Sequence, residues 1–125
     1  MSFNTKALIL IDHGSKVEEA NKMLSLIAEK LKDRNNTGYG IIEYCHMELA
    51  SPTLEDAFRE CIRNGAKEIV VHPYFLVPGR HSKSDIPGMV NNLIGKYPEV
   101  KCTVSEPLGL HDKIIDVILE RAQSC

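Results

Sequence analysis

Residues 67–87 read KEIVVHPYFLVPGRHSKSDIP, and the rest of the chain can be interpreted outward from them. The apolar run from Ile69 to Tyr74 is typical of a buried strand. It breaks at Pro78-Gly79 and is followed by two cationic or ligand-type side chains, Arg80 and His81. A strand that leads into such a loop is characteristic of open α/β sheets, which bind ligands at the carboxyl ends of their strands.

Apolar periodicity predicts an alternation of strands and helices along the whole chain. Continuous apolar runs predict strands buried on both faces, and apolar residues three or four positions apart predict helices. The predicted strands are Lys6–Ile11, Gly40–His46, Ile69–Tyr74 and Val100–Val104. The predicted helices are Val17–Leu31, Thr53–Arg63, Asp85–Tyr97 and Leu110–Ala122. This order predicts one α/β domain, residues 1–125, with a four-stranded, mainly parallel sheet flanked by helices.

Local signals refine the helices. Thr53 and Asp56 have the spacing of a capping box, and Asn64-Gly65 is a typical helix end. Ser84 or Asp85 is predicted to cap the third helix. The first helix is predicted to pack through Ala20, Met23, Leu24, Ile27, Ala28 and Leu31. The last helix is predicted to pack through Ile114, Ile115, Val117, Ile118 and Leu119.

Composition excludes several classes of protein. The 125 residues carry a net charge of −2, with an isoelectric point near 6.2, so nucleic-acid binding is not expected. The longest apolar run, near Ile69–Val77, is far shorter than the ~20 residues of a membrane span. The N-terminus lacks the features of a signal peptide, so we expect a cytoplasmic protein. A plastid location stays open if a targeting segment was removed.

The cysteines give no sign of a metal or redox site. No two of them form a CxxC pair, which argues against zinc or thioredoxin-type chemistry. We expect reduced, mostly buried thiols, since cysteine often packs as a small hydrophobic residue. The cysteines are Cys45, Cys61, Cys102 and Cys125.

Polar side chains follow three of the predicted strands. His13 comes after the first strand, His46 and Glu48 after the second, and Arg80 and His81 after the third. Parallel strands end at one edge of a sheet, so these side chains are predicted to converge. A single loop histidine is more often an ordinary polar residue than a functional one, and the prediction depends on this convergence.

This group of side chains is suited to metal binding and to proton transfer. His13 and His81 can share a divalent transition metal, since imidazole suits Fe, Co, Ni, Zn and Cu. Glu48 can then be a third ligand or a proton acceptor. Asp12-His-Gly-Ser15 is neither a P-loop nor a dinucleotide-binding turn, and the chain has no Gly-x-Ser-x-Gly elbow of a serine hydrolase.

Several motifs carry a resemblance to a known family. They are Asp12-His-Gly-Ser15, His46-Met-Glu-Leu-Ala-Ser-Pro52, Pro73-Tyr-Phe-Leu-Val-Pro-Gly-Arg-His81 with Asp85-Ile-Pro87, and Glu106-Pro-Leu-Gly109. In these motifs, and over nearly its whole length, the sequence resembles the small sirohydrochlorin chelatases. These form the CbiX/SirB family within the class II chelatases. The sequence is most similar to the siroheme-type ferrochelatases.

The resemblance implies an enzyme that inserts Fe²⁺ or Co²⁺ into sirohydrochlorin without ATP or an organic cofactor, with Fe²⁺ favoured. It implies that His13, His81 and Glu48 are the catalytic and metal-binding residues, and that the chain forms a homodimer. The residues expected to bind the substrate are Ser15, Leu49, Phe75, Leu76, Pro78, Gly79 and Arg80. The chain lacks the cysteine-rich tail of some plant relatives, so no iron–sulfur cluster is expected.

Other interpretations remain open from the sequence. The first is a cobaltochelatase of cobalamin biosynthesis, since the iron and cobalt enzymes share these residues. The second is a carrier that binds metal or tetrapyrrole without turnover. The third is a structural domain whose histidines have no function.

Overall fold

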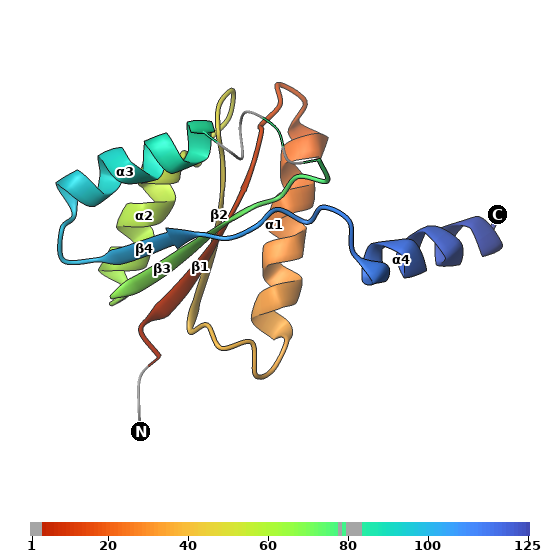
Figure 1. The fold of residues 1–125 in the computed structure, drawn as a ribbon, viewed down its shortest axis with the longest axis horizontal. Helices are drawn as coiled ribbons and strands as arrows, with labels where there is room; N and C mark the ends of the chain where they lie inside the picture. The colour runs from red at the N-terminus through yellow and green to blue at the C-terminus, as the bar shows by residue number, and fades with distance from the viewer. Residues whose placement is uncertain (1–3, 78, 80–83) are drawn as a thin grey trace.

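The computed structural model describes residues 4–77, 79 and 84–125. The four strands are β1 (Lys6–Asp12), β2 (Ile41–His46), β3 (Glu68–Pro73) and β4 (Lys101–Val104). The four helices are α1 (Glu18–Asp33), α2 (Leu54–Arg63), α3 (Ile86–Lys96) and α4 (Asp112–Gln123). Strands and helices alternate, as the sequence predicts (Figure 1).

The sheet has the strand order β2-β1-β3-β4, and every pair of neighbours is parallel. The predicted α/β class is therefore confirmed. The central strand β1 pairs with β2 on one side and with β3 on the other. Its last residue, Asp12, lies opposite His46, the last residue of β2. This register places the segments that follow β1 and β2 next to each other.

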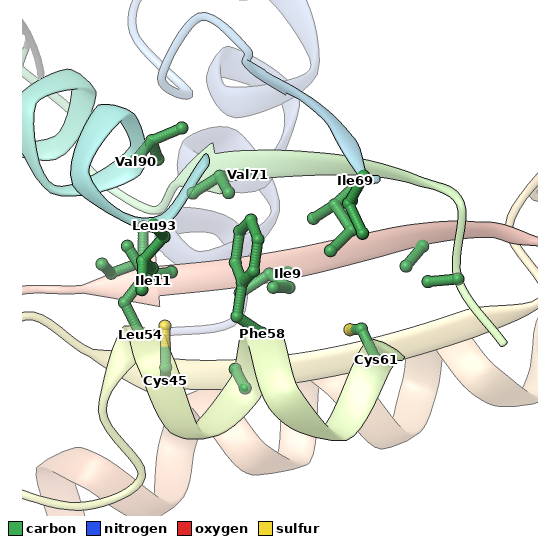
Figure 2. Packing of buried hydrophobic residues seen from close by; sticks show 14 of the residues in the cluster. Ile9, Ile11, Cys45, Leu54, Phe58, Cys61, Ile69, Val71, Val90 and Leu93 are labelled. Carbon is green, nitrogen blue, oxygen red and sulfur yellow. The ribbon is translucent and has the colours of Figure 1, made fainter. Parts of the chain in front are cut away.

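Alternate side chains of β1 enter two separate hydrophobic clusters. Ile9 and Ile11 face α2 and α3, where Phe58 fills the largest fully buried position. Figure 2 shows Phe58 rising from α2 toward the strands, with Val90 and Leu93 of α3 on the same face. Leu10 faces the other way, toward α1. Burial of a side chain such as Phe58 stabilises the fold by roughly 1.5–3 kcal/mol.

The ends of α2 follow the sequence signals. The Thr53 hydroxyl accepts from the Asp56 N–H at 3.1 Å, and the Asp56 carboxylate accepts from the Thr53 N–H at 2.9 Å. Gly65, beyond the helix, has φ of +95°, a conformation that glycine adopts without strain. At α3 the prediction holds only in part, because Asp85 occupies the N-cap position without a side-chain capping hydrogen bond.

The packing side predicted for α1 is partly wrong. Leu24 and Ala28 are buried, and Ile27 and Leu31 pack against them. Met23, however, is 57% exposed, and Ala20 is exposed as well. The reason is that α1 packs mainly on β2 and β1, at one side of its face of the sheet.

The packing predicted for α4 is not found within the described part of the chain. No residue of α4 is buried, and its large apolar side chains are about half exposed or more. Figure 1 shows α4 standing away from the sheet and from the other helices. Among the described residues, no helix has both the length and the apolar character needed to span a bilayer.

Candidate functional site

The segments after β1 and β2 bring His13 and Glu48 together. His13 Nε2 lies 3.2 Å from Glu48 Oε1, and the two side chains are 44% and 52% exposed. Two of the three residues predicted to form the site are thus in direct contact at the carboxyl edge of the sheet. A half-exposed imidazole beside a carboxylate is accessible to a ligand, and both groups can exchange protons with that ligand.

Backbone contacts hold these two segments in place. The Met47 N–H donates to the Asp12 carbonyl at 2.8 Å, and the Glu48 N–H donates to the His13 carbonyl at 3.1 Å. Between them, Gly14 has φ of +94°, and a Cβ there would lie 1.9 Å from the Glu48 carbonyl oxygen. The pair therefore depends on a residue without a side chain at position 14.

A second histidine–carboxylate pair lies beneath the first. His46 is 1% exposed, and its Nδ1 lies 2.6 Å from Asp12 Oδ1. His46, one of the side chains predicted to converge at the edge of the sheet, is a buried residue that Asp12 holds in place. Sequence reasoning missed Asp12 as its partner, since the contact follows from the register of β1 and β2.

Asn21 was also missed, and it fixes the loop that carries His13. Its side-chain amide donates to the Ser15 carbonyl at 2.7 Å, while its side-chain oxygen accepts from the Ser15 N–H at 3.0 Å. The Ser15 hydroxyl accepts from the Val17 N–H at 2.9 Å and so shapes the turn into α1. The first turn of α1 carries Glu18 and Glu19, which disfavour an anion at this helix N-terminus.

A polar hollow of about 420 Å³ lies beside the His13–Glu48 pair. It is bounded by α1, by the end of β2 and by residues 49–51, and Ser15 and Leu49 are among its lining residues. Leu49 has φ of +71°, and its side chain is 56% exposed. A non-glycine residue in this conformation is uncommon and is often found at a functional site.

The remaining predicted substrate residues fall into two groups. Leu76 is 60% exposed and Gly79 is exposed, whereas Phe75 is partly buried and packs against the core cluster around Phe58. The Phe75 side chain therefore belongs partly to the core. Its backbone carbonyl accepts from the Leu108 N–H at 3.0 Å. Pro78, Arg80 and His81 lie outside the described residues.

Only two of the three predicted metal ligands, His13 and Glu48, lie in the described part of the chain. No group of three or more His, Cys, Asp or Glu side chains suited to a metal ion lies together there. His13 and Glu48 offer one imidazole nitrogen and carboxylate oxygens, a donor set that fits Fe²⁺ or Co²⁺. The third predicted ligand, His81, is not among the described residues.

The cysteines and the remaining histidines give no second candidate site in the described part of the chain. Burial raises the pKa of the Cys45 thiol strongly and that of Cys61 to about 12, so neither is a nucleophile at neutral pH. The prediction of mostly buried thiols holds for these two, but Cys125 is exposed. His72 Nδ1 lies 2.9 Å from Ser105 Oγ, and His111 occupies the N-cap position of α4, where its Nδ1 accepts from the Lys113 N–H at 3.1 Å.

Comparison with known proteins gives a consistent result. The family model described as CbiX matches residues 7–125. A relative named "Sirohydrochlorin ferrochelatase, chloroplastic", from Arabidopsis thaliana, is 42% identical over 94% of this chain and 52% of its own length. One named "Sirohydrochlorin cobaltochelatase", from Methanococcus maripaludis, is 32% identical over 94% of this chain and 97% of its own length.

A solved structure agrees with these matches. The sirohydrochlorin chelatase SirB from Bacillus subtilis subspecies spizizenii, in complex with cobalt, superposes with a TM-score of 0.87 at 27% identity. The match covers 96% of this chain and 50% of that chain. The chain thus spans about half the length of the plant relative and of SirB, and nearly the whole length of the archaeal relative. Both the family model and these relatives match nearly the whole chain, and the protein belongs to the CbiX family.

Proposed function

We propose that the protein is a sirohydrochlorin chelatase, and that residues 1–125 act as one chelatase domain. The reaction inserts a divalent metal into sirohydrochlorin without ATP or an organic cofactor. The observation that carries this proposal is the contact of 3.2 Å between His13 Nε2 and Glu48 Oε1 at the carboxyl edge of a CbiX-family sheet.

Metal insertion requires the macrocycle to lose two pyrrole N–H protons while the metal exchanges its ligands. Neutral imidazole can hold the metal or accept a proton, because its ordinary pKa near 6.5 suits both roles. Glu48 lies within reach of the same proton and of the same metal as His13. We assign His81 as the third member of this group. The protein then positions the metal and the macrocycle and supplies acid–base groups.

The substrate is a polycarboxylate macrocycle, so its site needs apolar contacts and cationic groups. Leu49 and Leu76, both more than half exposed, supply apolar surface near the edge of the sheet. Ser15, Pro78 and Gly79 complete the proposed contact surface, with Phe75 behind it. We assign Arg80 to the carboxylates of the substrate, since a guanidinium binds carboxylate bidentately.

Fe²⁺ is the favoured metal, and the product is then siroheme. The support is the 42% identity to a protein named as a ferrochelatase, against 32% to one named as a cobaltochelatase. A cobaltochelatase is the second candidate, because imidazole and carboxylate bind both metals. No iron–sulfur cluster is part of the proposal.

We propose a homodimer that acts in the cytoplasm or in a plastid. An archaeal relative of similar length supports a functional unit of this size. The plastid alternative is supported by the name of the plant relative, which is chloroplastic.

The test is the rate of metal insertion under anaerobic conditions. Sirohydrochlorin is mixed with Fe²⁺, Co²⁺ or Ni²⁺, and the absorbance change is followed with and without the protein. We expect the protein to raise the rate most for Fe²⁺. A carrier without turnover would bind both partners and leave the spontaneous rate unchanged, which would refute the proposal.

Variants assign the roles of the site residues. His13→Ala, His81→Ala and Glu48→Gln are each expected to lower the rate by roughly 10²–10⁴-fold, the usual contribution of acid–base groups. Glu60→Gln, on the exposed side of α2, is the matched control and should keep the parent rate. Unchanged rates in all three site variants would show that these side chains have no part in the reaction.

A further inference from the structure

The polar hollow beside the His13–Glu48 pair carries two lysines that the proposed reaction does not include. Lys16, in the turn before α1, and Lys22, on the second turn of α1, are among its lining residues, and both are exposed. Within the described part of the chain, neither ammonium group forms an ion pair. Glu18 is the single carboxylate among the described residues that line the hollow, so with neutral histidine the lining carries one excess positive charge. A recess with excess positive charge attracts anions.

The hollow lies along the side of α1 and not across its N-terminus. The helix residues that line it are spaced three or four positions apart, so they share one side of the helix. They are Glu18, Asn21, Lys22 and Ser25. Glu19, the other acidic residue of the first turn, is not one of them. A ligand in the hollow therefore contacts side chains on the flank of α1 rather than the end of the helix.

Tyr44 of β2 borders the hollow from the side of the sheet. Its ring is partly buried and meets the His46 ring edge to face, with the ring centroids 5.8 Å apart. In the described part of the chain, the Tyr44 hydroxyl has no hydrogen-bond partner. A phenol O–H can donate to an anionic oxygen. The hollow thus offers a neutral donor in addition to its two cations.

The loop that carries Lys16 is fixed before any ligand binds. The Ser15 N–H donates to the Asn21 side-chain oxygen at 3.0 Å, and the Ser15 carbonyl accepts from the Asn21 amide at 2.7 Å. A site whose backbone is already ordered loses less conformational entropy on binding. The structure of the loop therefore favours binding through Lys16.

We propose that this hollow is a carboxylate subsite, in which Lys16 and Lys22 bind one peripheral carboxylate of the macrocycle and Tyr44 donates a hydrogen bond to it. The inference rests on the proposed function and deepens it, because it names side chains that orient the substrate. Leu49 connects the two places, since it follows Glu48 in the chain and also borders the hollow. A macrocycle that lies on Leu49 can face Glu48 with its centre and extend one carboxylate arm into the hollow.

The first test is the affinity for metal-free sirohydrochlorin, followed by absorbance under anaerobic conditions at several salt concentrations. Lys22→Gln should weaken binding by roughly 5–10-fold, the value of a charge-assisted contact that is partly exposed to solvent. The double variant with Lys16→Gln and Lys22→Gln should bind more weakly still and depend less on salt. Tyr44→Phe should weaken binding by roughly 2–10-fold.

Lys30→Gln is the matched control, because Lys30 is an exposed lysine of α1 that does not line the hollow. It should keep both the affinity and the salt dependence of the parent. Circular dichroism shows that each variant is folded. Parent affinity in the folded double variant would overturn the proposal, and parent affinity in Tyr44→Phe would remove the phenol from the subsite.

A free small anion shares the chemistry of the carboxylate arm, so inorganic phosphate and succinate are titrated separately. We expect the lysine substitutions to alter the binding of sirohydrochlorin. If they alter only the binding of phosphate or succinate and leave that of sirohydrochlorin unchanged, the hollow is a site for a free anion and the proposal fails.

The second test locates the contact by acetylation of lysines, read by mass spectrometry. Saturating metal-free sirohydrochlorin should slow the acetylation of Lys16 and Lys22 but not that of Lys30. Equal acetylation of Lys22 with and without the macrocycle would overturn the proposal.

Kinetics separate the subsite from the proposed activity. The double lysine variant should raise KM at least 5-fold and keep kcat within about twofold, because a peripheral carboxylate makes the same contact in the ground state and in the transition state. Metal insertion with an unchanged KM would retain the chelatase and refute the subsite. Lysine-dependent binding of sirohydrochlorin without metal insertion would retain the subsite and refute the chelatase.

Discussion

At the scale of single residues, Gly14 governs the geometry of the His13–Glu48 pair. Its positive φ and its contact with the Glu48 carbonyl leave no room for a side chain. Any other residue must push the segments after β1 and β2 apart. The pair is therefore sensitive to a position that has no chemistry of its own.

We predict that Gly14→Ala destabilises the protein by about 1–3 kcal/mol, the usual cost of a strained backbone conformation. The same substitution should lower the rate of metal insertion, because it displaces Glu48 from His13. Gly88→Ala is the matched control. Nothing lies within 4 Å of a Cβ at that position in α3, and alanine is the better helix former there. Denaturant unfolding compares the two, and equal stability of Gly14→Ala and the parent would contradict the prediction.

The buried pair beneath the site leads to a second prediction. Asp12→Ala leaves the His46 ring without its carboxylate partner and should cost about 1–3 kcal/mol. Asp33→Ala, at the exposed end of α1, should change stability by less than about 0.5 kcal/mol.

Activity distinguishes positioning from simple support of the fold. If Asp12 and His46 position Glu48, Asp12→Ala should lower kcat at temperatures where the variant is fully folded. A variant with the parent kcat would restrict the pair to a structural role.

The sequence could predict the meeting of His13 and Glu48, but not the pairing of Asp12 with His46. The first prediction needs only the rule that parallel strands end at one edge. The second needs the register of β1 and β2, which depends on how α1 and α2 pack on them. One residue of slippage would place Asp12 opposite a different side chain.

At the scale of helices and strands, α2 is the clearest case of local control. The Thr53–Asp56 capping box was predictable because all its partners lie within four residues. Two backbone N–H groups at the start of the helix are satisfied by the two side chains.

We predict that Thr53→Ala lowers the free energy of unfolding by about 1 kcal/mol. A double-mutant cycle with Asp56→Ala should give less than the sum of the two losses, since each side chain completes the bond of the other. Ser25→Ala, within α1, is a control without a capping role. Additive effects of Thr53→Ala and Asp56→Ala would show that the two bonds act independently.

Helix α4 shows what sequence periodicity cannot predict. The pattern correctly predicts an amphipathic helix and its apolar side. It carries no information about which surface covers that side, because the covering surface belongs to the tertiary or quaternary arrangement. Met23 of α1 illustrates the same point, since it lies in the apolar pattern of the helix but is 57% exposed.

At the scale of the whole molecule, His72 couples stability to pH. Burial lowers the pKa of His72, an effect partly offset by a hydrogen bond with the Glu106 backbone. The unfolded chain therefore binds a proton more readily than the folded one. As pH falls below the ordinary histidine value near 6.5, the unfolded state gains protons first and stability decreases.

We predict that the denaturant midpoint drops between pH 7 and pH 5, and that His72→Asn reduces this drop. Asparagine can still bond to the Ser105 hydroxyl, which lies 2.9 Å from the His72 ring. His111→Asn is the matched control, because asparagine also caps helices and the drop should persist. An unaltered pH profile in His72→Asn would assign the loss of stability to other groups.

The central place of β1 in the sheet has a consequence for synthesis of the chain on the ribosome. The strand made earliest among those described needs both neighbours, yet β3 is complete only at Pro73, some sixty residues after β1. Until β3 leaves the exit tunnel, one edge of β1 has no hydrogen-bonding partner. Distant pairings of this kind slow folding and expose strand edges. The nascent chain is therefore most vulnerable to misassembly before its second half has been translated.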